Sequence, residues 1–387
     1  MSWALIPLSE EQLAIQQTAR EFARAEIAPH SDRWDRDGGF DRDIATRLAA
    51  LGFLGMMIPE EYEGLGLDTR TYLVALEEIA AVDASVAVLM SVHNSLPTQM
   101  LLRYGSAAQK ERFLKPMARG EWLGAFALSE PDAGSDAASL TAQAVRDGDH
   151  YVLNGVKAWV SHGSLADVIL CMVRTDAPTE RKGARGISTF VLTPDMSGLR
   201  IGKKEDKMGI RGDPTVQIVL DGIRVSKDHL LGEEGMGFVY AMQSLESGRL
   251  GISAQAIGIA RAALEHSVRY AGERKQFGKP IKEFQAIQFK LADMATRVTA
   301  SRALLYAAAA AKDRGEPITQ FASMSKLMST ETAMWVTTQA IQIFGGYGYV
   351  KDYPVERLFR DAKVTEIYEG TSEIQRIVIA RELYART

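Results

Sequence analysis

The stretch that decides the fold is Asp147-Gly148-Asp149-His150-Tyr151-Val152-Leu153-Asn154-Gly155. Asp-Gly and Asn-Gly are dipeptides that hairpin turns favour, because their residues adopt positive φ at little cost. The run Tyr151-Val152-Leu153 between them has the composition of a strand. The stretch therefore predicts two hairpin turns and a β-rich region, in a chain whose other segments have a helical period.

The β-rich region around that stretch is expected to cover residues 121–232. Three further apolar runs lie in it, over 168–173, 187–192 and 215–220, and Gly and Pro separate them. Short runs with turn residues between them are typical of all-β units. We therefore expect a middle domain that is an antiparallel β-barrel or a sandwich of about 110 residues.

Residues 1–120 have a helical period instead. Mixed charges at helix spacing over 13–27 predict a helix that Pro29 stops, and the Gly- and Glu-rich segment 59–66 predicts a break. A second helical stretch is expected over 72–89. One apolar stripe in it predicts these core residues: Leu73, Leu76, Ile79, Ala80 and Val86.

The helical period returns over residues 233–387. The expected helices cover 238–272, 284–314, 321–344 and 372–384. Helices of such length pack as an antiparallel bundle. The predicted fold class is therefore mainly α with a central β domain, in the order helical domain, β domain, helical bundle.

Composition argues against several classes of function. Of 387 residues, 46% are hydrophobic and 24% are charged, and the formal net charge is −4, so the basic surface of a nucleic-acid-binding protein is not expected. The single cysteine, Cys171, stands in an apolar run, which predicts a buried thiol and neither a disulfide nor a metal site. No apolar stretch approaches the length of a membrane span. Because the first residues show no signal or transit pattern, we expect a soluble protein of the bacterial cytoplasm, or the mature form of a mitochondrial one.

Two segments near the predicted β region are unusual for a plain core. Residues 126–136 place Gly134 and Ser135 after a predicted strand, where backbone N–H groups could face an anion. Because this segment also carries three carboxylates, an acidic surface loop is the simpler interpretation. Residues 157–163 hold Trp159, which could stack on a flat heterocycle or belong to the core. They also hold His162, a lone histidine more typical of structure than of catalysis.

A third feature combines residues 273–278 with 342–349. Arg274 offers a planar guanidinium suited to a pyrophosphate. Gly345 and Gly346 are expected to end a helix and to let another group approach the backbone. A helix C-cap and a surface arginine would explain these residues equally well.

The fourth segment is Ile367-Tyr368-Glu369-Gly370-Thr371-Ser372-Glu373-Ile374-Gln375. Ser372 and Gln375 form a capping-box pattern, so a helix is expected to begin here. Glu369 then lies in the turn before that helix. An apolar setting raises the proton affinity of a carboxylate, as a general base requires, although a solvated loop glutamate would be the default interpretation.

In this order and spacing the four segments resemble the acyl-CoA dehydrogenase family over essentially the whole chain. Lys203-Lys204-Glu205-Asp206-Lys207-Met208-Gly209-Ile210 and Gly248-Arg249-Leu250-Gly251 are most similar to its short-chain, butyryl-CoA branch. The resemblance implies an FAD flavoprotein that converts an acyl-CoA to a trans-2-enoyl-CoA. It also implies a fold of a helical domain, a β-barrel and a four-helix bundle.

The resemblance further implies a set of site residues. Those expected to bind FAD within one chain are Phe126, Leu128, Ser129, Gly134, Ser135, Trp159, Ser161, Thr371 and Glu373. Those expected to reach the FAD of a neighbouring subunit are Arg274, Gln276, Phe277, Gln285, Gln342, Gly345 and Gly346. Those expected near the substrate are Ser135, Glu246, Arg249, Tyr368, Glu369 and Gly370. Because such sites are shared between subunits, the resemblance implies a homo-oligomer, typically a tetramer built as a dimer of dimers.

Glu369 matches the family's catalytic glutamate, which removes the α-proton while the β-hydrogen leaves as hydride to flavin N5. Relatives that take the base from the long helix carry it at the position of Gly248, which is no acid here. Arg249 is expected to anchor the substrate region and to bond to Glu246, or to form only a structural ion pair with it. Ser129 in place of threonine, and Ser161-His162 in place of Thr-Asn, depart from the family pattern but keep a hydroxyl.

Other functions of the same fold remain as alternatives. Acyl-CoA oxidases, usually longer chains, reoxidise FAD with oxygen instead of an electron-transfer flavoprotein. A nucleic-acid-binding relative would need a basic surface, and a helical interaction scaffold would leave the four segments unexplained. We therefore expect an acyl-CoA dehydrogenase with an electron-transfer flavoprotein as acceptor and no metal. Its acyl group is left open between butyryl, isobutyryl, 2-methylbutyryl and medium chains, with short chains favoured.

Overall fold

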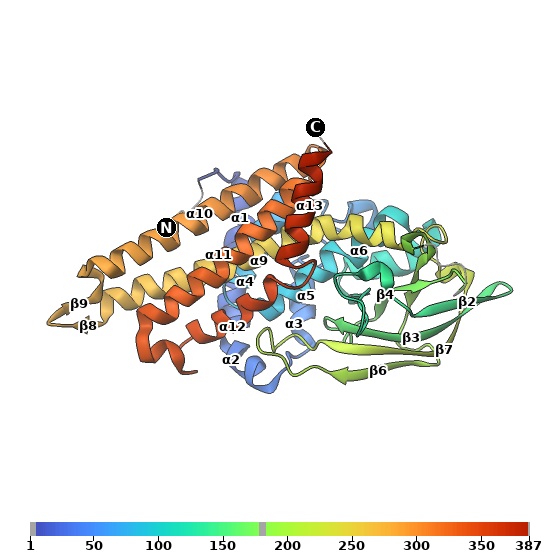
Figure 1. Ribbon diagram of the computed structural model, residues 1–387, viewed down its shortest axis with the longest axis horizontal. Helices are drawn as coiled ribbons and strands as arrows, with labels where there is room; N and C mark the ends of the chain where they lie inside the picture. The colour runs from blue at the N-terminus through green and yellow to red at the C-terminus, as the bar shows by residue number, and fades with distance from the viewer. Residues whose placement is uncertain (1–4, 178–182, 386–387) are drawn as a thin grey trace.

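The computed structural model describes residues 5–177 and 183–385. The molecule is elongated: the sheet lies at one end, the N-terminal helices lie near the middle, and the long C-terminal helices extend to the other end (Figure 1). The predicted order of helical, β and helical regions is confirmed.

The N-terminal region consists of short helices. They are α1 (Glu10–Phe22), α2 (Ala28–Asp37), α3 (Asp43–Ala50), α4 (Thr69–Ala80), α5 (Ala84–Ser95), α6 (Pro97–Tyr104), α7 (Ala107–Gln109) and α8 (Lys115–Ala118). The prediction that Pro29 stops the first helix is wrong. A π turn over Ala23–Ile27 leads directly into α2, and Pro29 lies in the first turn of α2, where a proline is tolerated.

The helical stretch predicted over 72–89 is divided between α4 and α5. The carboxylate of Asp83 caps α5, because it accepts hydrogen bonds from the backbone N–H groups of Ser85 and Val86. All five predicted core residues are buried. Both helices pack against α9 (Gly237–Glu273), so their apolar stripe belongs to the contact between the N-terminal helices and the C-terminal bundle.

The middle region is one curled sheet of seven strands. They are β1 (Gly124–Ala127), β2 (Gln143–Asp147), β3 (His150–Val160), β4 (Val168–Arg174), β5 (Ile187–Leu192), β6 (Leu199–Lys204) and β7 (Val216–Ser226). The strand order is β1-β4-β2-β3-β7-β6, with β5 paired to β4. Most pairs are antiparallel as predicted, but β4 is parallel to both β1 and β2. Cys171 on β4 is buried as predicted, and burial raises the pKa of its thiol to about 11.

Only one of the two predicted hairpin turns forms. Asp147 pairs with His150, so Gly148 lies in a two-residue turn between β2 and β3. Asn154-Gly155 instead lies within β3, at a bulge where its register against β7 shifts. Gly155 has a φ of 143°, and a Cβ there would overlap Ala142. Asn-Gly thus bends a strand that pairs on both edges.

The C-terminal region contains all four predicted helices. They are α9, α10 (Gln285–Asp313), α11 (Thr319–Phe344) and α13 (Ser372–Tyr384), with a short hairpin of β8 (Lys275–Gln276) and β9 (Lys279–Pro280) after α9. A further helix that was not predicted, α12 (Val355–Thr365), packs against α9 and α11. None of the helices in the described residues is long and apolar enough to cross a membrane.

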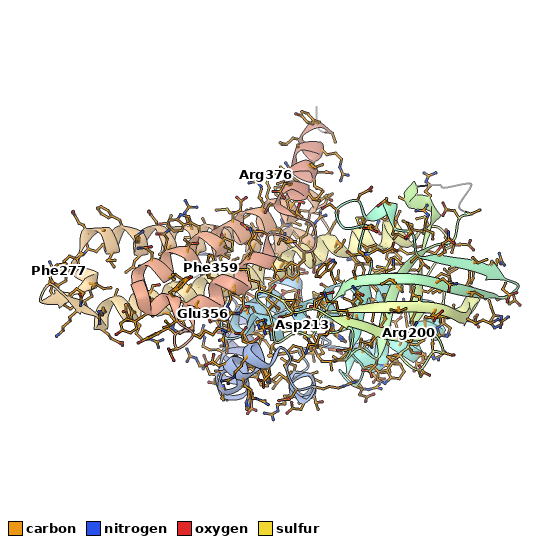
Figure 2. The ribbon with its side chains drawn as sticks, turned by 60° about the horizontal axis from the view of Figure 1, so that its bottom comes forward. Arg200, Asp213, Phe277, Glu356, Phe359 and Arg376 are labelled. Atoms are coloured by element: carbon orange, nitrogen blue, oxygen red, sulfur yellow. The ribbon has the colours of Figure 1, made fainter. Side chains whose placement is uncertain are left out.

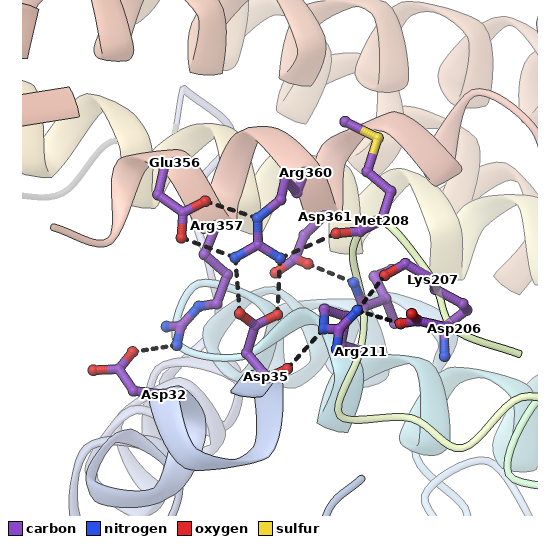
Figure 3. A network of polar contacts seen from close by, with 11 residues as sticks. Asp32, Asp35, Asp206, Lys207, Met208, Arg211, Glu356, Arg357, Arg360 and Asp361 are labelled. Carbon is purple, nitrogen blue, oxygen red and sulfur yellow. Dashed lines mark hydrogen bonds and ion pairs between the residues drawn. The ribbon is translucent and has the colours of Figure 1, made fainter. Parts of the chain in front are cut away.

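A polar network on α12 ties the three regions together (Figure 3). The Arg360 guanidinium donates to both carboxylate oxygens of Asp35 on α2, at 2.8 and 2.9 Å, and to Glu356. The carboxylate of Asp361 accepts a hydrogen bond from the backbone N–H of Ile210. The loop over residues 205–215 is therefore held between the N-terminal helices and the bundle.

Candidate active site

Glu369 lies in the turn between α12 and α13. Its φ is 52°, and that of Gly370 is 94°, so two consecutive residues adopt the left-handed conformation. Both carboxylate oxygens are buried and have no hydrogen-bond partner among the described residues. Burial raises the pKa of this carboxyl to about 7, although Lys326 and Arg249 act in the opposite direction. The alternative of a solvated loop glutamate is thereby wrong.

The start of α13 fixes the turn that carries Glu369. The helix begins at Ser372 as predicted, but its cap is Thr371, whose hydroxyl accepts from the backbone N–H of Ile374. The predicted capping box of Ser372 and Gln375 is therefore wrong: the N-cap lies one residue earlier, and the residue three positions after it is Ile374, which has no polar side chain. The Gln375 amide instead donates to the carbonyl oxygen of Gly370 at 2.8 Å and so closes the turn.

Two glycines on α9 make room in front of this turn. A Cβ at Gly248 would lie closer than 3.0 Å to an Oε atom of Glu369. A Cβ at Gly251, three residues further on, would lie 2.5 Å from the hydroxyl of Ser91 and 3.3 Å from that of Tyr72. Both hydroxyl oxygens are buried. The absence of an acid at position 248 is thus a geometric requirement of the base at 369.

The residues predicted to contact substrate do not all pair as expected. Arg249 is buried on α9 and donates to the hydroxyl of Ser323 at 3.3 Å, while Glu246 accepts from the hydroxyl of Thr319. The prediction of a hydrogen bond or an ion pair between Arg249 and Glu246 is therefore wrong, because each side chain has another partner. Tyr368 donates its hydroxyl to Gln255, which fixes the ring beside Glu369.

The predicted flavin-facing residues come together at the end of β3. The backbone N–H of Ala158 donates to the carbonyl of Ser129 at 2.9 Å, so the segment after β1 runs beside Trp159. Trp159 is 61% exposed at a φ of 60°, which overturns its interpretation as a core residue. Its neighbours on this surface differ in burial: Leu128 is buried, Phe126, Ser129 and Ser161 are half-buried, and Gly134 and Ser135 are exposed.

An ion pair between Lys157 and Glu130 explains the acidic loop, and no sequence pattern pointed to either residue. The Lys157 ammonium is fully buried and donates to Glu130 at 2.8 Å and to the carbonyl of Leu128 at 3.1 Å. Glu130 also accepts from the backbone N–H groups of Thr141 and Ala142. One of the three carboxylates is therefore neutralised inside the loop, and Gly134 and Ser135 face solvent at its tip.

His162 is structural, as predicted. Its ring lies between Asp213, at 3.1 Å from Nδ1, and the carbonyl of Gly124, at 3.0 Å from Nε2. Its own backbone N–H donates to the same carboxylate at 3.2 Å. Because both ring nitrogens face acceptors, the pair fixes the turn after Trp159 against β1 and the loop over 205–215.

A second group of predicted residues lies far from Glu369. Arg274, Gln276, Gly345 and Gly346 line a hollow of about 790 Å³ together with aromatic rings that include Tyr270, Phe344 and Tyr347. Phe277 is 94% exposed, and it lies at the end of the bundle farthest from the sheet (Figure 2). Gln285 and Gln342 are exposed, as is Glu373 in the first group, and Thr371 is half-buried. One chain therefore does not bring the two groups together.

Both groups have the chemistry that FAD requires. The exposed indole of Trp159 offers a face for a flat ring system, and the Arg274 guanidinium suits a pyrophosphate. A Cβ at Gly134, Gly345 or Gly346 would meet nothing within 4 Å, so the backbone is open to close approach there. In the described part of the chain no group of three His, Cys, Asp or Glu side chains is placed to hold a metal ion.

Comparison with known proteins identifies the family. Three family models match in order: the N-terminal domain of acyl-CoA dehydrogenase over residues 9–121, its middle domain over 125–223 and its C-terminal domain over 235–384. The chain belongs to the acyl-CoA dehydrogenase family. The predicted family, three-part fold, enzyme class and FAD cofactor are thereby confirmed.

Particular relatives are similar over nearly the full length. The mitochondrial short-chain specific acyl-CoA dehydrogenase of Mus musculus is 46% identical over 378 residues, which are 98% of this chain and 91% of that protein. The 3-(aryl)acrylate reductase of Clostridium sporogenes is 45% identical over 375 residues, 97% of this chain and 99% of that one. The solved structure of butyryl-CoA dehydrogenase from Megasphaera elsdenii is 43% identical, with a TM-score of 0.96 and coverage of 98% and 99%.

Proposed function

We propose that this enzyme dehydrogenates a short-chain acyl-CoA thioester and that Glu369 is the base that removes the α-proton. The observation that carries the proposal is the unpartnered, buried carboxylate of Glu369, for which Gly248 leaves the space. A base whose pKa lies near the working pH is half ionised there and accepts a proton readily. With a pKa raised to about 7, Glu369 meets this condition.

FAD, when bound, supplies the acceptor for the β-hydrogen as hydride. The protein's own part is to position the groups. Trp159, Ser129 and Ser161 would bind the ring system at the end of β3, and Gly134 and Ser135 would face phosphates. The backbone N–H of Glu369 would donate to the thioester oxygen, where negative charge develops when the α-proton leaves. One such donor typically lowers the barrier by about 2.7–4 kcal/mol.

A short acyl chain suits the space in front of Glu369. The hydroxyls of Ser91 and Tyr72 closely approach the position of a Cβ on Gly251, so they close the region beyond that glycine. The similarity to a short-chain specific dehydrogenase and to butyryl-CoA dehydrogenase favours the same class. Which short chain is used, straight or branched, stays a prediction.

Shared sites would explain the second residue group. Arg274 and the glycines at 345 and 346 lie at the far end of the bundle, so they could reach FAD only in another subunit. We therefore include a homo-oligomer in the proposal, a tetramer by family resemblance. By the same resemblance we propose an electron-transfer flavoprotein as the electron acceptor and the bacterial cytoplasm as the location of the enzyme.

The test is an anaerobic titration of the purified enzyme with CoA thioesters of increasing length and branching, followed by the visible flavin band. Wild type is expected to bleach with a short acyl-CoA. Glu369→Gln is expected to keep its FAD and to lose reduction rate by at least about 10²–10⁴-fold. Glu366→Gln, which makes the same change at the end of α12, is the matched control.

Each outcome separates the alternatives. Near-normal reduction of Glu369→Gln would disprove the base assignment, and a wild type that no thioester bleaches would disprove the substrate class. A reductase would instead be reoxidised faster by the enoyl-CoA than it is reduced by the acyl-CoA. Reoxidation of the reduced enzyme by oxygen as fast as by an electron-transfer flavoprotein would favour the oxidase.

A further inference from the structure

Lys326 is a lysine without exposed surface on α11, directly behind the turn that carries Glu369. Its ammonium donates to the carbonyl oxygen of Gly370 at 2.8 Å. Lysine is almost never fully buried unless it is paired, yet no carboxylate of the described chain lies within ion-pair distance of this ammonium. Its burial needs another explanation.

The first contribution of Lys326 is to the shape of the turn. Glu369 and Gly370 both have positive φ, and a non-glycine residue adopts this conformation only where its surroundings hold it there. Two donors converge on the Gly370 carbonyl, the Lys326 ammonium and the Gln375 amide, each at 2.8 Å. They fix the peptide that follows the base, and with it the direction of the Glu369 side chain.

The second contribution is charge. Two charged side chains act on Glu369 from the helices packed around it, Lys326 on α11 and Arg249 on α9. Two phenols also lie near the carboxylate: burial, and then Glu369, raises the pKa of Tyr72 on α4 and of Tyr368 beside the base. Lys326 and Arg249 are the cations, and both lower the pKa that burial raises. Burial lowers the pKa of Lys326 itself to about 8, against the opposing effect of Glu369, with smaller ones from Glu366 and Glu373. The ammonium is therefore charged at neutral pH.

We infer that Lys326 is a positioning residue for the base: its ammonium holds the Glu369–Gly370 turn in its left-handed conformation and places a positive charge behind the Glu369 carboxylate. This inference rests on the proposed role of Glu369. It assigns a function to a lysine that the reaction itself does not consume and that no sequence motif marked.

The experiment compares the pH dependence of anaerobic flavin reduction in wild type, Lys326→Met and Lys326→Arg. Lys326→Met keeps the aliphatic stem and removes both the donor and the charge. It is expected to shift the rising limb of the rate profile upward by about one pH unit or more, with at least about a fivefold loss at pH 7 and partial recovery at pH 9. Lys326→Arg keeps the charge and is expected to keep the limb near its wild-type position.

A second readout does not depend on turnover. A 3-oxoacyl-CoA carries an acidic α-proton that can move to Glu369, which leaves an enolate beside the oxidised flavin and a long-wavelength absorption band. The pH midpoint of this band is expected to shift in the same direction in Lys326→Met. Lys312→Met is the matched control, since burial also lowers the pKa of Lys312 to about 8, but it lies at the end of α10 beside Asp313.

Three results decide the inference. It is overturned if folded, FAD-loaded Lys326→Met has the pH midpoints of Lys312→Met. It is also overturned if Lys326→Arg is as defective as Lys326→Met while both melt at the wild-type temperature, because charge would then contribute nothing. If Glu369→Gln itself reduces flavin normally, the proposed function has failed, whatever Lys326 does.

Discussion

Two buried glutamate carboxylates, one on a helix and one in a turn, behave in opposite ways. On α4, Glu77 accepts hydrogen bonds from Arg261 at 2.9 Å and from Arg302 at 2.6 and 2.9 Å. Burial alone would raise the pKa of Glu77, but the two guanidinium groups hold it below its usual value. The carboxylate oxygens of Glu369 are buried as well, but they have no hydrogen-bond partner among the described residues, and burial raises the pKa of this carboxyl to about 7.

The difference shows how the same side chain is used for structure or for chemistry. Glu77 joins α4 to α9 and α10 and stays ionised, so it cannot exchange a proton at neutral pH. Glu369 has cations nearby but no hydrogen bonds to them, so it stays close to the point at which it gains or loses a proton. Unsatisfied buried oxygens destabilise the fold, and at Glu369 that cost accompanies reactivity.

The largest expected effect is on the free energy of unfolding, and it concerns Glu77, the structural member of this comparison. Arg302→Met removes one of the two guanidinium partners of Glu77 and should lower the free energy of unfolding by about 3–5 kcal/mol, the usual cost of breaking a buried ion pair. Denaturant unfolding measures it. Arg314→Met, at an exposed pair with Glu316, is the control and should change stability by less than about 1 kcal/mol. A loss at position 302 as small as that of the control would show that the pair does not stabilise the contact.

The sequence predicted the local pattern around both glutamates but not their long-range contacts. The stripe of Leu73, Leu76 and Ile79 predicted a buried helix face. No motif indicates that Arg302 donates to Glu77, because these two residues are 225 positions apart in the sequence. Glu369 was assigned as the base through the family resemblance, because from its own segment a solvated loop glutamate was the default interpretation. What stayed hidden are the long-range contacts of that turn, above all the donation by Lys326.

The same reason explains the errors in the fold. Helix bounds after residue 233 were close, since long periodic segments depend on local pattern. Asn154-Gly155 was read as a hairpin turn, but the pairing of β3 with strands on both sides made it a bulge. Pro29 was read as a stop, although a π turn before it keeps the helix continuous. Helix α12 was missed, and its Arg360 and Asp361 are held by partners distant in sequence.

The variant Gly248→Ala tests whether the base needs the space that Gly248 leaves beside its carboxylate. Gly248→Ala adds a Cβ that would overlap the Glu369 carboxylate and should turn it away from the substrate. A displacement of about 1 Å at a reacting group can cost about 10²-fold, or about 2.7 kcal/mol of barrier. Anaerobic flavin reduction measures this loss.

The control lies on the same helix. A Cβ at Gly272 on α9 would meet nothing within 4 Å, so Gly272→Ala should leave the reduction rate unchanged and stabilise the helix by up to about 1 kcal/mol. Equal rates in the two variants would mean that the carboxylate adjusts without penalty, and that Gly248 is not required by the base.

The smallest effect on flavin reduction is expected at a third buried carboxylate, that of Asp361, which among the described residues has one hydrogen bond where Glu77 has three and Glu369 has none. It accepts one backbone N–H, from Ile210, and burial raises its pKa from 3.8 to about 7. The folded protein therefore holds a proton that the unfolded chain releases. The stability from this group is complete below about pH 4 and is lost as the pH rises to about 7, which amounts to about 4 kcal/mol at about 1.4 kcal/mol per pKa unit.

Asp361→Asn does not titrate, so its unfolding free energy should fall less between pH 4 and pH 7 than that of wild type. Glu369→Gln should flatten the same dependence, because its folded-state pKa is raised as well. The two variants should differ in chemistry: only Glu369→Gln should abolish flavin reduction, and Asp361→Asn should keep the wild-type pH midpoint of the rate. Asp361 and Glu369 both have a pKa raised to about 7, so the raised pKa alone does not distinguish a structural acid from a catalytic one. A shifted midpoint in Asp361→Asn would mean that the polar network on α12 acts on the base, and that the two acids are not independent.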